Sequence, residues 1–131
     1  MVKTMDEVME RFRSIDFPEE FDLIVAIAHG GIIPAAILNQ RLQMEVRPLY
    51  INLRDEQQQP RYPLPRLLAP VDFDYCDRSI LLVDDRVKTG ATFFLALHLL
   101  QGARLIRTFA VNGSADYSLY DEECFRMPWL M

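Results

Sequence analysis

One stretch, residues 79–92 (SILLVDDRVKTGAT), limits the possible folds of this chain more than any other. Within it, Ile80–Val83 is a short apolar run of the kind that forms a buried strand of a parallel sheet. Asp84 and Asp85 end the run, and residues 89–101 begin with Thr-Gly-Ala-Thr and continue as an apolar segment that predicts a helix. The stretch therefore predicts a strand, a charged loop and a helix N-terminus in succession.

The loop in this stretch has the chemistry to bind a phosphorylated sugar. The first amides of a helix lack partners within the helix and lie at the positive end of its dipole, so the Thr-Gly-Ala-Thr turn is a candidate phosphate site. Gly90 allows close approach, and Thr89 and Thr92 add hydroxyl donors. Asp84 and Asp85 can accept hydrogen bonds from sugar hydroxyls or hold a divalent cation through water. The alternative is an ordinary loop whose acids are only solvated.

Residues 80–92 resemble the ribose-phosphate signature of the type I phosphoribosyltransferases: four apolar residues, two acids, three variable residues and Thr-Gly-x-Thr. The resemblance implies an α/β fold, with a central, mostly parallel sheet, helices on both faces and a small C-terminal hood at about residues 112–131. Response-regulator receiver domains also place paired acids after an apolar strand, but a phosphoacceptor aspartate ends a later strand there. Here the later aspartates, Asp116 and Asp121, do not end an apolar run.

The bulk properties predict a single cytoplasmic domain that covers residues 1–131. Half of the residues are apolar and 25% are charged, and no apolar stretch is long enough to span a membrane. Residues 1–20 lack the pattern of a signal peptide. The net charge of −5 gives no attraction to nucleic acid or to an anionic membrane, so we expect neither as a partner. Cys76 and Cys124 lack the spacing of a metal pair, and we expect reduced thiols.

A second strand, glycine turn and helix is predicted upstream. Residues 22–28 form an apolar, partly β-branched run, His29-Gly30-Gly31 follows, and residues 32–44 predict a helix with a proline in its first turn. The turn resembles the pyrophosphate loop of the same family, which implies that its amides approach the pyrophosphate and that the peptide bond before His29 is cis. The family usually has Arg or Lys at this position, whereas His29 is charged only when protonated, so we expect weaker or pH-dependent binding. Alternatively, His29 is an exposed loop residue without a role.

Other segments complete the predicted sheet and its covering. Thr4 and Glu7 form a capping box that begins an amphipathic helix, and residues 46–53 and 104–111 predict two further strands. Residues 54–70 are rich in proline and glutamine and lack periodicity. The resemblance implies that they form a flexible lid over the reacting ribose; the alternative is a proline-stiffened surface loop or a dimer contact.

The C-terminal segment resembles the bacterial xanthine-guanine branch of the family. By that similarity, Phe125 and Trp129 stack on a flat heterocycle, although both can instead close the core or a subunit interface. Lys88 departs from that branch, where the position before Thr-Gly is usually an aspartate that manages a purine ring proton. A lysine ammonium cannot accept this proton, so Lys88 is expected to pair with an anionic acceptor, with phosphate, or with Asp84 or Asp85 in the empty site.

The resemblance implies transfer of the 5-phosphoribosyl group from phosphoribosyl pyrophosphate (PRPP) to a nucleobase, with release of pyrophosphate, in nucleotide salvage. Mg²⁺ is the implied cofactor, held by the substrate or by two acids through water, and a homodimer is the implied assembly. The implied catalytic residues are Asp84, Asp85 and Lys88. The implied PRPP-binding residues are His29, Gly30, Gly31, Asp84, Asp85, Lys88, Thr89, Gly90, Ala91 and Thr92, and the base-binding residues are Phe125 and Trp129. A regulator with the same fold that binds a phosphoribosyl ligand without turnover is the alternative.

Overall fold

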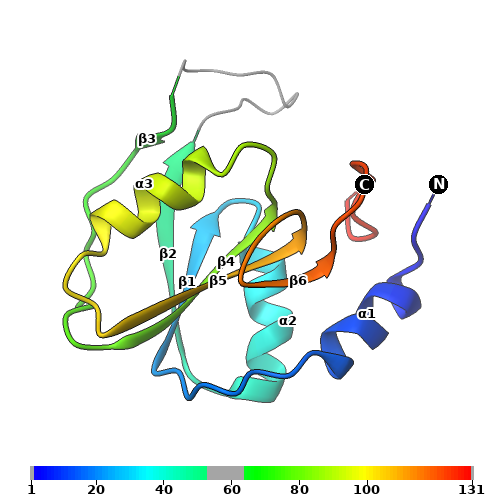
Figure 1. Ribbon diagram of the computed structural model, residues 1–131, viewed down its shortest axis with the longest axis horizontal. Helices are drawn as coiled ribbons and strands as arrows, with labels where there is room; N and C mark the ends of the chain where they lie inside the picture. The colour runs from blue at the N-terminus through cyan, green and yellow to red at the C-terminus, as the bar shows by residue number, and fades with distance from the viewer. Residues whose placement is uncertain (1, 53–63, 131) are drawn as a thin grey trace.

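The protein folds around a six-stranded sheet with the order β3-β2-β1-β4-β5-β6 (Figure 1). A computed structural model describes residues 2–52 and 64–130. All neighbouring strands are parallel except the pair formed by β3 and β2, which is antiparallel. The strands are β1 (Leu23–Ala28), β2 (Glu45–Asn52), β3 (Arg66–Leu67), β4 (Ser79–Arg86), β5 (Leu105–Asn112) and β6 (Tyr117–Tyr120). The predicted mostly parallel α/β sheet is confirmed.

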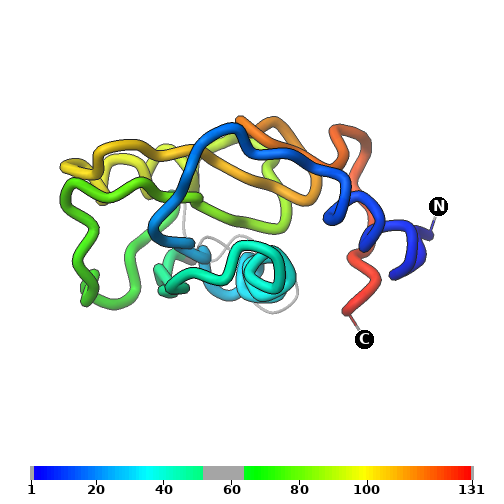
Figure 2. The backbone as a smooth tube through the Cα atoms, turned by 90° about the horizontal axis from the view of Figure 1, so that it is seen from below, coloured from blue at the N-terminus to red at the C-terminus, as the bar shows by residue number. Residues whose placement is uncertain are grey.

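Within residues 2–52 and 64–130, three helices cover the sheet: α1 (Met5–Ser14), α2 (Ile32–Leu42) and α3 (Ala91–Leu99). Side chains of α1 and α2 join one buried cluster, and those of α3 join a second cluster across the sheet. Figure 2 shows α2 standing out on one side of the sheet. Helices on opposite faces follow from right-handed crossovers that leave the centre of the sheet in opposite directions.

The two central strands supply most of the core. All six residues of β1 are buried, and so is the run from Ser79 to Val83 in β4. Successive side chains of a strand point to opposite faces, so an uninterrupted apolar strand feeds the clusters on both sides. The capping box predicted for α1 is confirmed, because Thr4 accepts from the amide of Glu7 and the Glu7 carboxylate accepts from the amide of Thr4.

Several boundaries differ from the sequence-based expectation for physical reasons. β4 continues through Asp84 and Asp85 because its backbone keeps pairing with β5 up to Arg86. α2 ends at Leu42 instead of residue 44 because Gln43 takes a left-handed conformation with φ of 51°.

Two short strands were missed by the sequence prediction. β6 lies within the segment predicted to be a hood, and β3 lies within the segment predicted to be a lid. β3 is held on the edge of the sheet by pairing with β2. Most of the predicted lid, residues 53–63, lies outside the described residues, so that expectation stays a prediction. Within the described chain no helix is long and apolar enough to cross a membrane.

Candidate functional site

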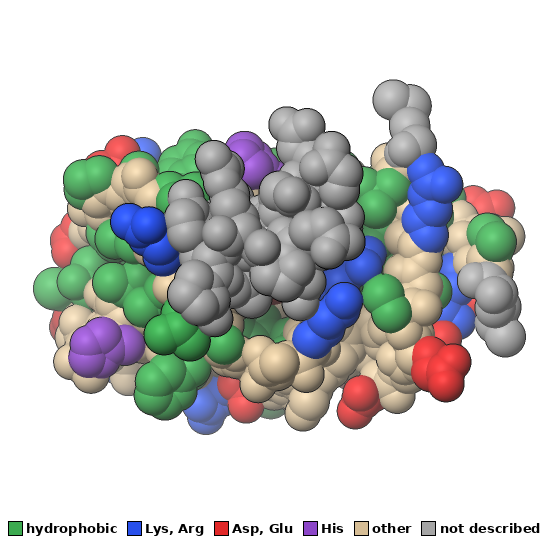
Figure 3. All heavy atoms as spheres, turned by 90° about the horizontal axis from the view of Figure 1, so that it is seen from above, with side chains coloured by type: hydrophobic (Ala, Val, Ile, Leu, Met, Phe, Trp, Pro, Cys, Tyr) green, Lys and Arg blue, Asp and Glu red, His purple; other side chains and the backbone are tan. Residues whose placement is uncertain are grey.

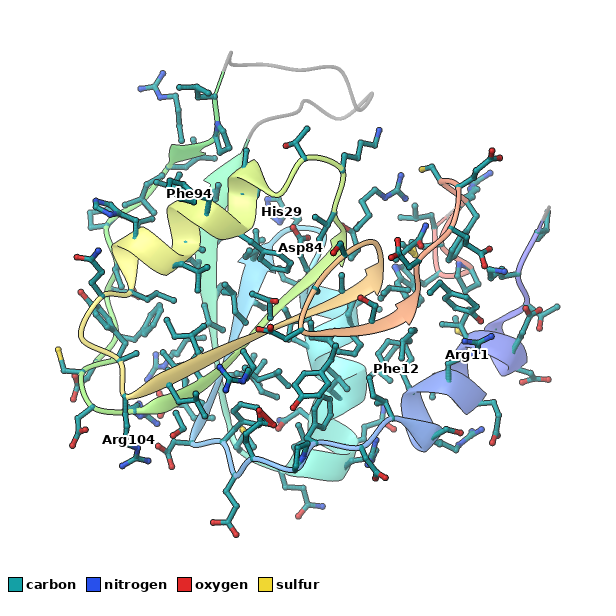
Figure 4. The ribbon with its side chains drawn as sticks, viewed as in Figure 1. Arg11, Phe12, His29, Asp84, Phe94 and Arg104 are labelled. Atoms are coloured by element: carbon teal, nitrogen blue, oxygen red, sulfur yellow. The ribbon has the colours of Figure 1, made fainter. Side chains whose placement is uncertain are left out.

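The carboxyl ends of β1 and β4 lie side by side, because these strands are direct neighbours with Ala26 paired to Val83. The chain leaves β1 toward β2 on one side and β4 toward β5 on the other. Loops that diverge in this way leave a crevice at the edge of an α/β sheet, where ligands generally bind. Figure 4 labels His29 and Asp84 at this edge, near the point where the two loops meet.

The loop after β1 packs directly against the β4 unit. A Cβ atom on Gly31 would lie 2.2 Å from the carbonyl oxygen of Val83, and one on Gly30 would lie 2.6 Å from Oδ1 of Asp85. Both distances are shorter than real Cβ contacts, so the backbone around Gly31 requires glycine for space, whereas a Cβ on Gly30 would force the Asp85 side chain to move. The Gly31 amide donates to the carbonyl of Ile27 at 2.7 Å, which closes the turn. The structure thus brings the predicted pyrophosphate loop against a predicted ribose-binding acid.

The expected cis peptide bond between Ala28 and His29 is present. The His29 side chain is exposed, and its ring centroid lies 6.3 Å from that of Tyr50 in an edge-to-face arrangement. Tyr50 lies on β2, the strand on the other side of β1, and its side chain is also exposed. The imidazole therefore stands at the open edge of the sheet, where an anion can reach it.

Asp84 and Asp85 are held by the backbone that follows them. Oδ1 of Asp84 accepts from the Asp85 amide at 2.8 Å, and Oδ1 of Asp85 accepts from the Arg86 amide at 2.7 Å. Both side chains are partly buried. Removal from water and the neighbouring charge of Asp85 raise the pKa of Asp84 well above its ordinary value. A bound cation would relieve this repulsion.

This pair of carboxylates fits a magnesium ion that reaches the protein with a phosphate ligand. Mg²⁺ prefers oxygen ligands and commonly takes only one or two carboxylates, with substrate phosphates and water completing its shell. Among the described residues there is no group of three or more His, Cys, Asp or Glu side chains able to hold a metal. Asp84 and Asp85 would therefore act as part of a shared shell and not as a complete protein site.

The signature loop, residues 86–90, leads from β4 to the N-terminus of α3. Gly90 has φ of +83°, and no described atom lies within 4 Å of the position of an added Cβ. It takes the N-cap position without a side-chain hydrogen bond to the helix, although Thr89 Oγ1 accepts from the Ala91 amide at 3.3 Å. This end of α3 consequently has room for an anion.

Lys88 projects from the signature loop as an exposed side chain. Within the described part of the chain no ion pair joins it to Asp84 or Asp85, so that expected pairing is wrong for this structure. Figure 3 looks onto this edge and shows Lys and Arg side chains at several places on it. Individual cationic side chains are thus present at this edge, although the whole chain carries a net charge of −5.

The hood places Phe125 and Trp129 in apolar surroundings. Phe125 is 8% exposed and meets the ring of Tyr120 edge-on at 5.3 Å between centroids. Trp129 is partly buried against the same cluster, and its ring centroid lies 6.5 Å from that of Phe12. Both rings contribute to the core, which was the alternative considered for them. Their predicted contact with a base stays a proposal.

Comparison with known families agrees with this geometry. Residues 3–121 match the family model described as phosphoribosyl transferase domain. The chain belongs to this family. The match includes both loops at the carboxyl edge of the sheet and most of the fold around them.

This phosphoribosyl transferase domain is 29% identical over 111 residues to an orotate phosphoribosyltransferase of Sulfurisphaera tokodaii; the match covers 82% of the chain and 50% of that protein. The chain thus spans about half the length of this relative. Its fold matches a purine phosphoribosyltransferase from Pyrococcus horikoshii (TM-score 0.80, 21% identity, 98% and 92% of the two chains). It also matches a Neisseria gonorrhoeae protein with bound ppGpp (TM-score 0.68, 18% identity, 86% and 70%). At these two structural identities the likeness shows the fold alone.

One residue of the phosphoribosyl transferase domain was missed by reasoning from the sequence. Asn112 ends β5 as a buried polar side chain, whereas the sequence analysis ended this strand at residue 111 and placed Asn112 in the hood. The available signal was its position at the carboxyl end of a strand beside β4, since such ends converge on the same edge of a parallel sheet.

Proposed function

We propose that this protein is a phosphoribosyltransferase that transfers the 5-phosphoribosyl group from PRPP to a nucleobase in nucleotide salvage. The observation that carries the proposal is the contact of the Gly30 backbone with the Asp85 carboxylate in a chain that belongs to this family. This contact brings a loop suited to pyrophosphate beside acids suited to ribose hydroxyls. The signature loop and the N-terminus of α3 lie at the same edge and suit the 5′-phosphate.

In the proposed reaction, the bond from the anomeric carbon to pyrophosphate breaks and a bond to a ring nitrogen of the base forms. The amides of His29 and Gly30 receive the charge of the departing group, while the Gly31 amide holds the turn closed through the Ile27 carbonyl. Asp84 and Asp85 accept hydrogen bonds from the ribose hydroxyls and favour the cationic ring of the transition state. Bound Mg²⁺ would supply further charge neutralisation for the leaving pyrophosphate.

Binding of the 5′-phosphate far from the reacting carbon positions that carbon for attack. The backbone of residues 88–92 and the hydroxyls of Thr89 and Thr92 perform this role in the proposal. The Lys88 ammonium group has no lone pair with which to accept the proton released by the base, so it serves as a cation near phosphate or near an anionic acceptor. We therefore place orotate, which is an anion, beside the purines in the set of bases to be tested.

A second function is supported by two residues that depart from the family pattern. His29 replaces the usual permanent cation of the pyrophosphate loop, and Lys88 replaces an acid. Lys88 can still bind phosphate but weakens the case for purine chemistry, and His29 makes pyrophosphate binding weaker or pH-dependent. The fold neighbour from Neisseria gonorrhoeae holds ppGpp, a phosphorylated nucleotide. A regulator that binds a phosphoribosyl ligand without turnover is thus the second candidate.

The two functions are separated by mixing the protein with Mg²⁺, PRPP and a panel of purines, pyrimidines and orotate while measuring pyrophosphate release. Transfer predicts release stimulated by one class of base. Binding without turnover predicts that PRPP raises the melting temperature while no base stimulates release, a result that would contradict the enzyme proposal. Absence of both effects would contradict both candidates.

Asp85→Asn tests the ribose-binding role in the same assay. The amide keeps the shape of the carboxylate but loses its charge, so PRPP affinity is expected to fall about tenfold or more while the fold persists. Asp121→Asn, a change of an exposed acid in the hood, is the matched control for net charge and should bind PRPP like the wild type. Unchanged affinity of Asp85→Asn would remove this residue from the site.

We also propose that two copies of the chain associate through α3. On this helix Phe94 is 77% exposed and Leu97 is 39% exposed, and Figure 4 labels Phe94 on α3. Residues three apart on a helix lie on the same face, and contiguous exposed apolar surface marks interaction sites. Sedimentation of the purified protein tests the proposed homodimer.

A further inference from the structure

Asn112 uses its side chain to hold one short stretch of the hood. It is 5% exposed, and its Nδ2 group donates to the carbonyl oxygens of Glu122 at 3.2 Å and Glu123 at 3.4 Å. Its Oδ1 atom accepts from the Glu122 amide at 3.0 Å. A carboxamide is the side-chain group that donates to two carbonyls and accepts from an amide at once. These bonds fix the path of the hood backbone at residues 122 and 123.

The main chain of Asn112 contacts the signature loop on its other side. Its carbonyl oxygen accepts from the Val87 amide at 2.9 Å, and its backbone lies in register with Arg86 of β4. The next residue, Gly113, also packs closely against the signature loop, because a Cβ at this position would lie 2.5 Å from the Val87 carbonyl oxygen. The main chain of Asn112 therefore contacts the signature loop, while its side chain hydrogen-bonds to the hood.

Side chains from two other parts of the chain, Lys3 and Arg86, also contact this part of the hood. Nζ of Lys3 lies 2.8 Å from Oε1 of Glu122, and the buried Lys3 side chain places this ammonium 4.4 Å from the ring centroid of Tyr120. Nη1 of Arg86 lies 3.1 Å from Sγ of Cys124. The hood segment, residues 122–125, thus contacts Lys3 near the N-terminus, the end of β5 and the signature loop.

We infer that Asn112 is a positioning residue, which fixes the hood segment against the signature loop and so sets the geometry between the base and the ribose phosphate. This inference rests on the proposed function for its effect on the base. Without the carboxamide, two carbonyls and one amide lose a buried partner, and the backbone must move to find others. The hood is the side of the site assigned to the base, whereas PRPP is held by the loops after β1 and β4.

The expected kinetic result is a split between the two substrates. Loss of the carboxamide should raise the KM for the base about tenfold or more, which corresponds to a buried hydrogen bond, and change the KM for PRPP by less than about threefold. A residue that only stabilised the fold would lower the amount of folded protein and leave both KM values unchanged.

The variants are Asn112→Ala, Asn112→Asp and the control Asn39→Ala. Aspartate keeps the shape and the acceptor of Asn112 but presents negative oxygen to two carbonyls. Asn39 also bonds a main chain, since its Oδ1 accepts from the Met44 amide at 2.8 Å, but it lies at the end of α2 away from the His29 loop. The control should lose stability without a KM split.

A second readout follows the hood without any turnover. Trp129 is the single tryptophan of the chain and lies in the hood, so its quenching by acrylamide reports hood packing. Hydrogen exchange at amides 120–125 reports the hood segment directly. In both Asn112 variants we expect stronger quenching and about tenfold faster exchange, while Asn39→Ala matches the wild type.

The outcomes separate this inference from the proposed function. Wild-type protein without turnover on any base contradicts the proposed function, while quenching and exchange still test whether Asn112 places the hood. Unchanged exchange and quenching in a folded Asn112→Asp protein overturn the inference. A KM for the base that stays at the wild-type value in a variant with a loosened hood overturns its functional half. If Asn112→Ala fails to fold, Asn112→Asp carries the test.

Discussion

The loops after β1 and β4 both pass from a buried strand through a glycine into a helix, yet their glycines are required for different reasons. Gly31 has an ordinary right-handed backbone with φ of −84°, but backbone atoms of Val83 and Ile27 leave no space for a Cβ. Gly90 has φ of +83°, and among the described residues nothing lies within 4 Å of an added Cβ. Gly31 is thus required by its neighbours, and Gly90 only by its own backbone conformation.

This difference shows how the two halves of the site depend on one another. The loop after β1 is fixed by contact with β4, so the shape proposed for pyrophosphate binding requires the other unit to be folded. The signature loop has open space at its glycine and exposed side chains at Lys88 and Thr89. It can therefore adjust to a phosphate, whereas the first loop must be formed in advance.

The largest expected effect comes from adding a methyl group to each glycine. In Gly31→Ala the Cβ would lie 2.2 Å from the Val83 carbonyl oxygen, so β1 and β4 must separate, and we expect destabilisation of about 3 kcal/mol or more. In Gly90→Ala only the positive φ opposes the change, and we expect about 1 kcal/mol. Urea unfolding of both variants gives the two free energies.

Equal losses in the two variants would show that the loops are not constrained differently. A soluble yield of Gly31→Ala too low for unfolding agrees with the larger loss, provided that Gly90→Ala is purified normally from the same host. A stable Gly31→Ala protein with wild-type unfolding would contradict the close packing of the two loops.

Local sequence pattern was sufficient for the parts of this fold that depend on local forces. The apolar run before Asp84 predicted a central strand, and the capping box of Thr4 and Glu7 predicted the start of α1, because both depend on residues close in sequence. The same pattern ended β4 too early. Continuation through Asp84 and Asp85 depends on hydrogen bonds from β5, a partner about twenty-five residues away, as the register shows.

The candidate site was only partly predictable for the same reason. Gly30 was recognised as part of a turn, but its contact with Asp85 joins two units separated by more than fifty residues. Asn112 and the hood segment depend on side-chain to backbone bonds that leave no periodic pattern. Phe125 and Trp129 were assigned from resemblance alone, and composition cannot tell a ring that stacks on a ligand from one that packs in a core.

A smaller effect is expected where the first loop meets a side chain instead of backbone. In Gly30→Ala the new Cβ would lie 2.6 Å from Oδ1 of Asp85, and the carboxylate can turn away at moderate cost. We expect PRPP affinity to fall about tenfold, because the acid leaves its place beside the loop, with a much smaller loss of stability than in Gly31→Ala. Calorimetric titration with PRPP and Mg²⁺ measures the affinity.

A double variant shows whether the loop after β1 and Asp85 contribute to PRPP affinity together or independently. If Asp85 acts through its position, a Gly30→Ala, Asp85→Asn double variant should lose less affinity than the sum of the two single changes. Fully additive losses would mean that the loop and the acid bind independently. Wild-type affinity in Gly30→Ala would contradict the assignment of this contact to the site.

The smallest expected effect tests the charge stored at the end of β4. Burial and Asp85 raise the pKa of Asp84, so the folded state binds a proton more readily than the unfolded state. Stability from this group is therefore complete below the ordinary aspartate pKa of about 4 and is lost as the pH rises through the raised value.

Asp84→Asn cannot ionise, and its Oδ1 can still accept from the Asp85 amide. Relative to wild type, the variant should gain on the order of 1 kcal/mol at neutral pH and nothing at pH below about 4. Urea unfolding between these pH values, without Mg²⁺ or phosphate, measures the difference, and Asp121→Asn corrects for net charge. A gain that does not change with pH would mean that the charge of Asp84 does not destabilise the fold. The signature loop would then differ from the loop after β1 in geometry alone.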